Sequence, residues 1–259
     1  MKAIGLTLLS IASLCGTSSN ATAIWDALPA IEPEQPRLIR VANTAPRNNE
    51  PVVGLPCENC ENVFVGMPAT LASNARIAPV DEPGEAMRLS GRTLDGKGKP
   101  VPGVIVYAYQ TNQKGMYSLT NDVPPRIKLR GWVASDDQGR YSFDTIRPGS
   151  YPNRPDAAHI HLHVIEVGRC TYYIDNVVFD DDPRLKNDSS SPASRGGSGV
   201  TRPRMDEQGV WRVTRDIHLG RNVPGYEKCG RLNEELRTTA AMKSKSHVDA
   251  RKMATAAAR

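Results

Sequence analysis

The sequence predicts an all-β protein, a two-sheet β-sandwich flanked by disordered termini. Short runs of β-branched and aromatic residues alternate with turns that contain glycine or proline, as hairpin strands require. The 259 residues include 21 glycines and 20 prolines, and no repeat of fixed period is present. This composition favours short strands over long helices. The part of the chain expected to fold is long enough for one domain with one core.

The strand-like segments follow one another in compact order, and several of them end at a turn signal. Asp95-Gly96, Asp137-Gln138-Gly139 and Pro148-Gly149 are typical turn sequences. The spacing suits a sandwich of two sheets. A long mobile loop is expected over 187–204, because this stretch is rich in serine and glycine. The predicted strands are 87–94, 104–111, 131–135, 141–146, 158–167, 170–179 and 210–219.

The first 23 residues have the layout of a secretory signal peptide. Lys2 precedes an apolar run over 4–14, and the small residues Ala21-Thr22-Ala23 follow. The run is too short to span a bilayer, so no stable membrane span is expected. Cys15 offers a less favoured alternative as a lipid-attachment site, because Leu14 is larger than the residue such sites prefer. The expected location is therefore periplasmic or secreted.

The remaining chain divides into three parts. Residues 24–54 are rich in proline, asparagine and charge, and are expected to form an extended leader. Residues 55–229 form the predicted sandwich domain, and 230–259 are a basic, alanine-rich tail. The net charge of +5 is modest and concentrated in this tail, which favours a solvated tail or frayed helix over a nucleic-acid partner. The sequence does not determine the oligomeric state.

Export would leave four cysteines in the mature chain, namely Cys57, Cys60, Cys170 and Cys229. An even number in an oxidising compartment predicts disulfides, and three connectivities remain open. The pair Cys57-x-x-Cys60 also has the spacing of a redox or zinc motif. No second pair with metal-ligand spacing accompanies it, so a structural disulfide is favoured.

Three histidines occur at every second position in the segment 158–164. Strand alternation places His159, His161 and His163 on one face and the intervening aliphatic residues on the other. Two imidazoles two residues apart on a strand are able to bind one metal. A polar strand surface and a satisfied core network are the alternatives, and His163 is interpreted as a rim histidine rather than as a further ligand.

Two tyrosines strengthen the metal interpretation. Tyr151 follows a proline-containing turn shortly before the histidines, and Tyr117 follows a predicted strand and Gly115. A phenolate is a hard anionic donor that favours a highly charged hard metal, and coordination must lower the tyrosine pKa from about 10. Two phenolates with two imidazoles therefore suit Fe(III).

The chain resembles the intradiol ring-cleavage dioxygenases, the family of the protocatechuate and catechol dioxygenases and in particular their C-terminal catalytic domain. The resemblance covers about residues 85 to 180, in the order of the family's motifs. Its matching stretches are Leu89-Ser90-Gly91-Arg92, Pro102-Gly103-Val104, Tyr109-Gln110-Thr111-Asn112, Gly115-Met116-Tyr117-Ser118, Asp137-Gln138-Gly139-Arg140-Tyr141-Ser142-Phe143, Ile146-Arg147-Pro148-Gly149-Ser150-Tyr151-Pro152 and Ala158-His159-Ile160-His161.

This resemblance implies a fold, a cofactor and a reaction. Tyr117 and His159 would be the equatorial ligands of Fe(III), and Tyr151 and His161 the axial ones. The substrates would be a catechol-type aromatic compound and O2, and the product a muconate-type diacid. Tyr151 would leave the metal when the catechol chelates it and accept a substrate proton.

One position departs from the family's pattern. Asp156 stands three residues before His159, where an arginine that stabilises negative charge on the ring is usual, and the loop from Tyr151 is several residues shorter. Arg154 is the expected substitute, or activity is altered or lost. Asn176 takes the place of the polar amide that relatives carry on the following strand.

Two alternatives to the enzyme remain. The pattern from Gly91 to Tyr151 also matches transthyretin-like or carboxypeptidase-regulatory-like modules, which bind partners without the histidines. An iron-binding homologue without ring cleavage follows from Asp156. Two further interpretations are structural: the run 180–182 is taken as a solvated turn, and four aromatic residues as core, namely Trp132, Tyr107, Tyr109 and Tyr172.

Overall fold

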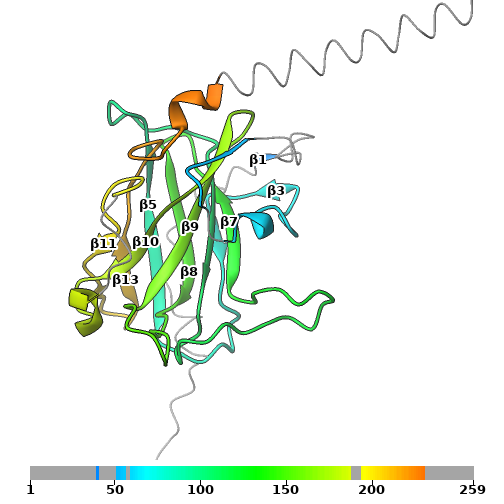
Figure 1. Ribbon diagram of the computed structural model, residues 1–259. Helices are drawn as coiled ribbons and strands as arrows, with labels where there is room; N and C mark the ends of the chain where they lie inside the picture. The colour runs from blue at the N-terminus through cyan, green and yellow to red at the C-terminus, as the bar shows by residue number, and fades with distance from the viewer. Residues whose placement is uncertain (1–38, 41–50, 57–58, 188–193, 231–259) are drawn as a thin grey trace, which may run out of the picture.

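A computed structural model describes residues 39–40, 51–56, 59–187 and 194–230 (Figure 1). The predicted signal peptide and all of the predicted tail except Gly230 lie outside these residues. Within them the chain forms strands and three short 3₁₀ helices, η1 (Cys60–Asn62), η2 (Pro183–Asn187) and η3 (Tyr226–Lys228). No helix in the described part is both long and apolar enough to span a membrane. The all-β prediction is confirmed.

One of the two main sheets carries the histidines, and we call it the histidine sheet. Neighbouring strands in it are, in order, β11 (Val200–Thr201), β10 (Cys170–Phe179), β9 (His159–Glu166), β6 (Ile105–Gln110) and β7 (Arg130–Ala134). The central strand β9 pairs antiparallel with both β10 and β6. The short strand β2 (Val52–Val53), which lies within the predicted leader, adds to β10 in parallel.

The second sheet, the facing sheet, covers one face of the histidine sheet. Its order is β12 (Arg204–Met205), β13 (Trp211–Thr214), β5 (Ala86–Leu94), β8 (Arg140–Ile146) and β4 (Asn74–Arg76), with β14 (Ile217–His218) also paired to β5. A separate ladder joins β1 (Ile39–Arg40) to β3 (Thr70–Leu71). The two main sheets form the predicted sandwich.

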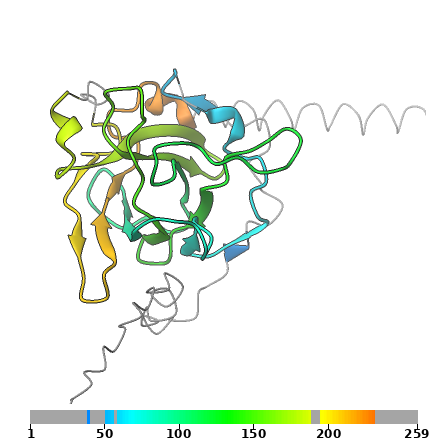
Figure 2. The same cartoon turned by 90° about the horizontal axis from the view of Figure 1, so that it is seen from below.

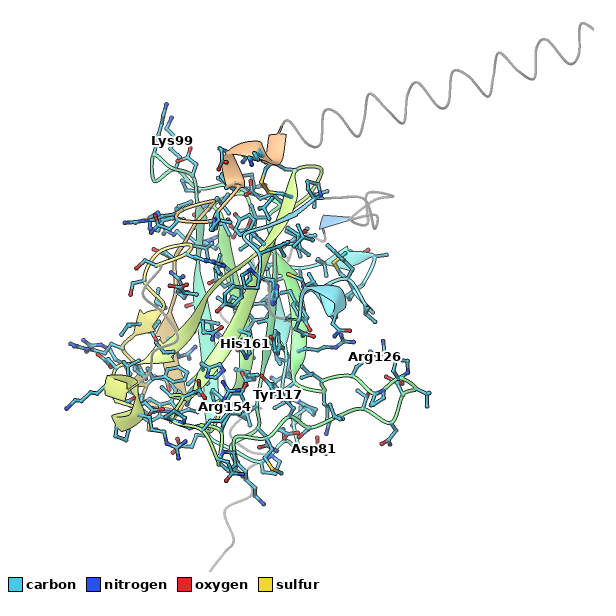
Figure 3. The ribbon with its side chains drawn as sticks, viewed as in Figure 1. Asp81, Lys99, Tyr117, Arg126, Arg154 and His161 are labelled. Carbon is cyan, nitrogen blue, oxygen red and sulfur yellow. A yellow bond between two sulfur atoms is a disulfide. The ribbon has the colours of Figure 1, made fainter. Side chains whose placement is uncertain are left out.

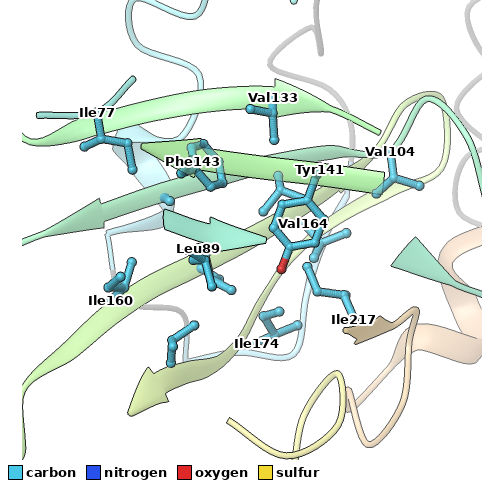
Figure 4. Packing of buried hydrophobic residues seen from close by; sticks show 14 of the residues in the cluster. Ile77, Leu89, Val104, Val133, Tyr141, Phe143, Ile160, Val164, Ile174 and Ile217 are labelled. Atoms are coloured by element: carbon cyan, nitrogen blue, oxygen red, sulfur yellow. The ribbon is translucent and has the colours of Figure 1, made fainter. Parts of the chain in front are cut away.

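The main core lies between the two sheets (Figure 4). The aliphatic positions of β9 contribute Ile160, Leu162 and Val164, and the facing sheet contributes Leu89 and Phe143, all of them buried. Each such side chain contributes roughly 1.5–3 kcal/mol by leaving water. Because alternate residues of β9 point to opposite faces, the histidines must lie on the outer face of this sheet.

The outer face of the histidine sheet is covered by a second, smaller cluster instead of solvent. It includes Tyr107 and Tyr109 of β6 and Trp132 of β7, which are buried as the sequence predicted. The chain preceding β4 packs over them, and the indole nitrogen of Trp132 donates to the carbonyl of Val63 at 2.7 Å. Beside this cluster, a hairpin over 118–128 projects from the sandwich (Figure 2).

The segment predicted as a mobile loop over 187–204 is partly ordered by the fold. Its described residues include β11 and β12's first residue, and the guanidinium of Arg215 donates to the carbonyls of Arg195, Gly196 and Gly197. The predicted strand 210–219 is divided into β13 and β14. Arg215, between the two, is buried, and its guanidinium donates hydrogen bonds to loop carbonyls that would otherwise be buried without a donor.

Two disulfide facts concern the four predicted cysteines. Cys170, the first residue of β10, forms a disulfide with Cys229, which follows η3. Cys60 is also disulfide-bonded, whereas Cys57 lies outside the described residues. The Cys170–Cys229 bond ties the last described segment of the chain to the histidine sheet.

Candidate metal centre

Four side-chain donor atoms of Tyr117, Tyr151, His159 and His161 lie close together at the end of the histidine sheet where β9 begins. Figure 3 labels two of these residues, Tyr117 and His161, which lie near each other. The two phenol oxygens lie 2.7 Å apart. The Tyr117 oxygen is 2.9 Å from Nε2 of His161, and this nitrogen is 3.2 Å from Nε2 of His159. The structure therefore brings together all four residues that the sequence predicted as metal ligands.

Strand β9 positions both histidines. His159 starts the strand, and its Nδ1 lies 2.7 Å from the carbonyl oxygen of Ala157. Because a carbonyl only accepts, Nδ1 carries the proton and Nε2 keeps its lone pair for the site. His161 lies opposite Tyr109 of β6, and their rings stack with centroids 4.3 Å apart. This stacking holds the His161 ring in one plane.

Tyr117 is positioned by a tight turn that follows β6. The side-chain oxygen of Asn112 accepts hydrogen bonds from the backbone N–H groups of Lys114 and Met116. Gly115, within this turn, has a φ of +74°. A Cβ there would lie 1.9 Å from the carbonyl oxygen of Ser150, so only glycine allows this approach.

Tyr151 is held against the same turn. The N–H of Gly149 donates to the Asn112 carbonyl at 2.9 Å, and the Thr111 hydroxyl donates to the Gly149 carbonyl at 2.8 Å. A Cβ on Gly149 would lie 2.3 Å from the Gln113 carbonyl oxygen. Two glycines thus let the backbones that precede the two tyrosines pack directly against each other.

The four donors fit a transition-metal ion. Donors at right angles, each about 2.0–2.1 Å from one ion, lie about 2.9 Å apart, close to the observed separations. Burial, with His159 and His163 nearby, lowers the pKa of His161 well below its usual value, so its imidazole stays neutral as a metal ligand must. No cluster of three or more His, Cys, Asp or Glu suited to a metal occurs in the described residues, so the site depends on its phenols.

The other two predicted site residues, Arg154 and Asn176, lie around this centre, and so does Asp156. The Arg154 guanidinium carbon lies 5.0 Å from the centre of the Tyr151 ring, and Arg154 also pairs with Asp156 at 2.7 Å. The negative charge of Asp156 is therefore directed at Arg154. Asn176, nearly buried at a bulge in β10, lies close enough to His161 to oppose part of the lowering of its pKa.

The interpretation of His163 as a rim residue was wrong. Its side chain is fully buried under the outer cluster, and burial lowers its pKa to about 3. Its Nδ1 lies 3.7 Å from the sulfur of Cys60, and its ring packs near Tyr107, Tyr109 and Tyr173. Strand alternation predicted the face of His163 correctly, but not that the chain before β4 covers this face.

Sequence reasoning also missed two residues that support the ligands. Tyr109 was predicted as core, which is correct, but it also forms the stacking surface for His161. Asn112 belongs to a matching stretch but was given no role, although its side chain organises the turn before Tyr117. The Asn-x-x-Gly spacing from Asn112 to Gly115 is the signal that would have identified this turn.

Comparisons with known proteins point to one family. A family model described as Dioxygenase matches residues 63–208. Chlorocatechol 1,2-dioxygenase of Rhodococcus opacus is 31% identical over 149 residues, which are 50% of this chain and 55% of that protein. The protocatechuate 3,4-dioxygenase beta chain of Burkholderia cepacia is 34% identical over 154 residues, which are 56% of this chain and 63% of that protein.

Solved structures give matches of similar extent. The dioxygenase domain of a dioxygenase and carbohydrate-binding protein fusion from Streptomyces sp. SirexAA-E aligns with a TM-score of 0.47 and 25% identity, covering 56% of this chain and 85% of that one. The two curated relatives are covered over 55% and 63% of their own lengths. The chain thus spans somewhat more than half of each of them.

Proposed function

Because the chain belongs to the intradiol dioxygenase family, we propose that it binds Fe(III) and uses O2 to cleave a catechol-type ring to a muconate-type diacid. The observation that carries this proposal is the convergence of two phenol oxygens and two imidazole nitrogens, in steps of 2.7, 2.9 and 3.2 Å. A mixed set of phenol and imidazole donors would by itself suit several metals. The presence of two phenolates favours a trivalent metal ion.

The ligand set would offset two of the three positive charges of the proposed metal. Tyr117 and Tyr151 would bind as phenolates and bring two negative charges, while His159 and His161 remain neutral. Ferric iron, when bound there, supplies the Lewis acid that activates the catechol. His161 is buried and stacked on Tyr109, so its ring is the most firmly held of the four proposed ligands.

Tyr151 is the side chain we assign to proton transfer. It is only half buried, it follows a turn rather than standing on a strand, and its oxygen lies within hydrogen-bond distance of the Tyr117 oxygen, at 2.7 Å. As a phenolate it would accept the proton of a catechol hydroxyl and become a neutral phenol. Arg154, beside its ring, supplies positive charge next to the site, and Asn176 lies near His161.

Metal analysis with a visible spectrum tests the site before any substrate is chosen. Protein purified with iron should hold close to one Fe(III) per chain and show a phenolate-to-iron charge-transfer band. Catechol and protocatechuate are then added in air, while oxygen uptake and muconate absorbance are followed. A colourless protein that takes up no ferric iron would contradict the proposal and favour a non-catalytic binding module.

A second candidate function is iron binding without ring cleavage. The observation in its favour is the pairing of Arg154 with Asp156 at 2.7 Å, which opposes the positive charge that Arg154 would offer to the reacting ring. A coloured protein that consumes no oxygen with either catechol would support this candidate over the enzyme.

We further propose that the protein is exported to the periplasm or secreted. The signal-like layout of residues 1–23 and the Cys170–Cys229 disulfide support this location, because disulfides persist in oxidising compartments. Cell fractionation with mass determination of the mature N-terminus tests it. Full-length protein retained in the cytoplasm would contradict export.

A further inference from the structure

One carboxylate contacts both ends of the segment that joins two of the proposed ligands. We call residues 151–159, from Tyr151 to His159, the ligand loop. The side-chain oxygen Oδ2 of Asp182 accepts a hydrogen bond from the backbone N–H of Ala158 at 2.7 Å and from the hydroxyl of Ser150 at 3.2 Å. These two donors immediately precede the two ligands in the sequence.

The second oxygen of Asp182 extends the contact to the inside of the loop. Oδ1 accepts from the backbone N–H of Arg184 at 2.8 Å, which fixes the turn into η2. The guanidinium of Arg184 then donates to the carbonyl oxygens of Tyr151 at 2.8 Å and Arg154 at 3.3 Å. The loop is therefore held at its start, at its end and in between.

The anchor of this contact is the histidine sheet itself. Asp182 follows β10 directly, and its N–H donates to the carbonyl of Phe179, the last residue of that strand. In the same region Val178 pairs with His159 across β10 and β9. Asp182 is thus fixed to the strand ladder that carries the imidazoles, while it holds the loop that carries the phenol of Tyr151.

The neighbouring acidic residues have different partners. Asp180 pairs with Arg202 at 2.7 Å, and Asp181 pairs with Arg147. The prediction that 180–182 forms a solvated turn is therefore wrong for Asp182, whose carboxylate is directed at the ligand loop. A carboxylate suits this place because it only accepts, and its two oxygens have enough lone pairs for all three donors.

We propose that Asp182, with Arg184, is a positioning residue that fixes the spacing of Tyr151 and His159 before any metal is bound. The expected effect of Asp182 on metal affinity rests on the proposed function, whereas its effect on the order of the ligand loop does not. Without the Asp182 carboxylate, the ends of the ligand loop would lose these hydrogen bonds. The loop would then have to become ordered when the metal binds, and this cost would weaken the affinity for the metal.

The test compares Asp182→Ala with Asp180→Ala, a matched change two residues away that removes a carboxylate paired with the solvent-facing Arg202. In the metal-free protein, hydrogen exchange of the Ala158 amide should become about 10-fold faster or more in Asp182→Ala, because a hydrogen bond to a charged group is lost. Asp180→Ala should leave it unchanged. Equal exchange in both variants would overturn the proposal.

Ferric iron titrations of the same variants provide the second readout. Asp182→Ala should bind iron about 10- to 100-fold more weakly than Asp180→Ala and show a shifted charge-transfer band. Asp182→Asn, which keeps one acceptor oxygen, should recover part of the affinity. Unchanged affinity and spectrum in Asp182→Ala would refute the link to the metal.

Failure of the two proposals is distinguishable. Wild-type protein that binds no iron would refute the proposed function, while faster Ala158 exchange in Asp182→Ala would still support the hold on the loop. If Asp182→Ala does not fold, two other variants are measured in its place: Ser150→Ala, which removes one contact, and Arg184→Met, which removes the two side-chain contacts of Arg184 with the loop. Unchanged loop exchange in both would count against Asp182 and Arg184 as positioning residues.

Discussion

The phenol oxygens of Tyr117 and Tyr151 lie 2.7 Å apart, although 34 residues separate the two tyrosines in the chain. Their proximity depends on backbone contact between the turns that precede them, through Gly115 and Gly149. Because rigid turns hold both phenols, the metal-free protein is already close to the geometry that a shared ion needs. Preorganisation of this kind reduces the ordering cost of binding.

The first prediction concerns the phenols themselves. Tyr117→Phe and Tyr151→Phe each remove one anionic donor, so each should weaken or abolish the ferric charge-transfer band and lower iron affinity at least about 10-fold. Tyr107→Phe is the matched control, because its ring lies in the outer cluster and its hydroxyl is not one of the four donors. An unchanged band in either ligand variant would remove that tyrosine from the site.

The second prediction separates backbone contact from backbone conformation. Gly115 and Gly103 have nearly the same φ, +74° and +73°, but a Cβ at Gly103 would meet no atom within 4 Å. Gly103→Ala should therefore cost only about 1–2 kcal/mol of unfolding free energy, the usual cost of a left-handed residue. Gly115→Ala should cost about 1–3 kcal/mol more, because the Ser150 backbone must move.

Urea unfolding of both glycine variants measures this difference, and the iron spectrum measures its consequence. Gly115→Ala should also change the charge-transfer band, since it separates the two turns, whereas Gly103→Ala should not. Equal unfolding free energies for the two variants would show that the contact with Ser150 relaxes without cost.

Local patterns were enough to predict much of this fold and site. The alternation of His159 and His161 with Ile160 and Leu162 predicted a strand with a polar and an apolar face, and the structure confirms both. The strand 170–179 was predicted with its observed bounds. Tyr117 and Tyr151 were predicted from the turns that precede them and from the resemblance, but nothing local shows that turns 34 residues apart meet.

The features that escaped prediction depend on backbone groups far away in the sequence. Asp182 and Arg215 act mainly through backbone carbonyl and N–H groups. Every residue carries these groups, so the side-chain pattern contains no sign of which ones a distant carboxylate or guanidinium will find. The burial of His163 was not predicted for a related reason. Strand alternation predicts on which face of β9 a side chain lies, but not which segment of the chain packs on that face.

The third prediction concerns the disulfide. Cys170 and Cys229 are 59 residues apart in the sequence, and the entropy of closing a loop of this length predicts that the bond stabilises the fold by about 4 kcal/mol. The double variant Cys170→Ala/Cys229→Ala should lose about that much unfolding free energy in urea. A loss below about 1 kcal/mol would show that the segment after η3 is held well enough without the bond.

Reductant provides the control for this measurement. Reduction of the wild-type protein removes both this disulfide and the one that includes Cys60. Reduction of the double variant removes only the latter. The difference between the two reductant effects should therefore match the loss seen in the double variant under oxidising conditions.

The fourth prediction concerns the choice of substrate. Asp156 pairs with Arg154, which lies beside the Tyr151 ring. Asp156→Ala should leave the guanidinium available to a carboxylate on the substrate. An exposed ion pair is worth about 0.2–1 kcal/mol, so kcat/KM for protocatechuate relative to catechol should rise about two- to fivefold. Arg154→Ala should lower the same ratio.

The matched control for this substrate effect is Asp136→Ala, which removes an equal charge from the ion pair with Arg140 at 2.7 Å. Both variants change the net charge by one unit, so a general attraction of anions would raise the protocatechuate ratio equally in both. A local effect of Arg154 requires the rise in Asp156→Ala alone. Equal rises would assign the effect to net charge and leave Arg154 without a part in substrate selection.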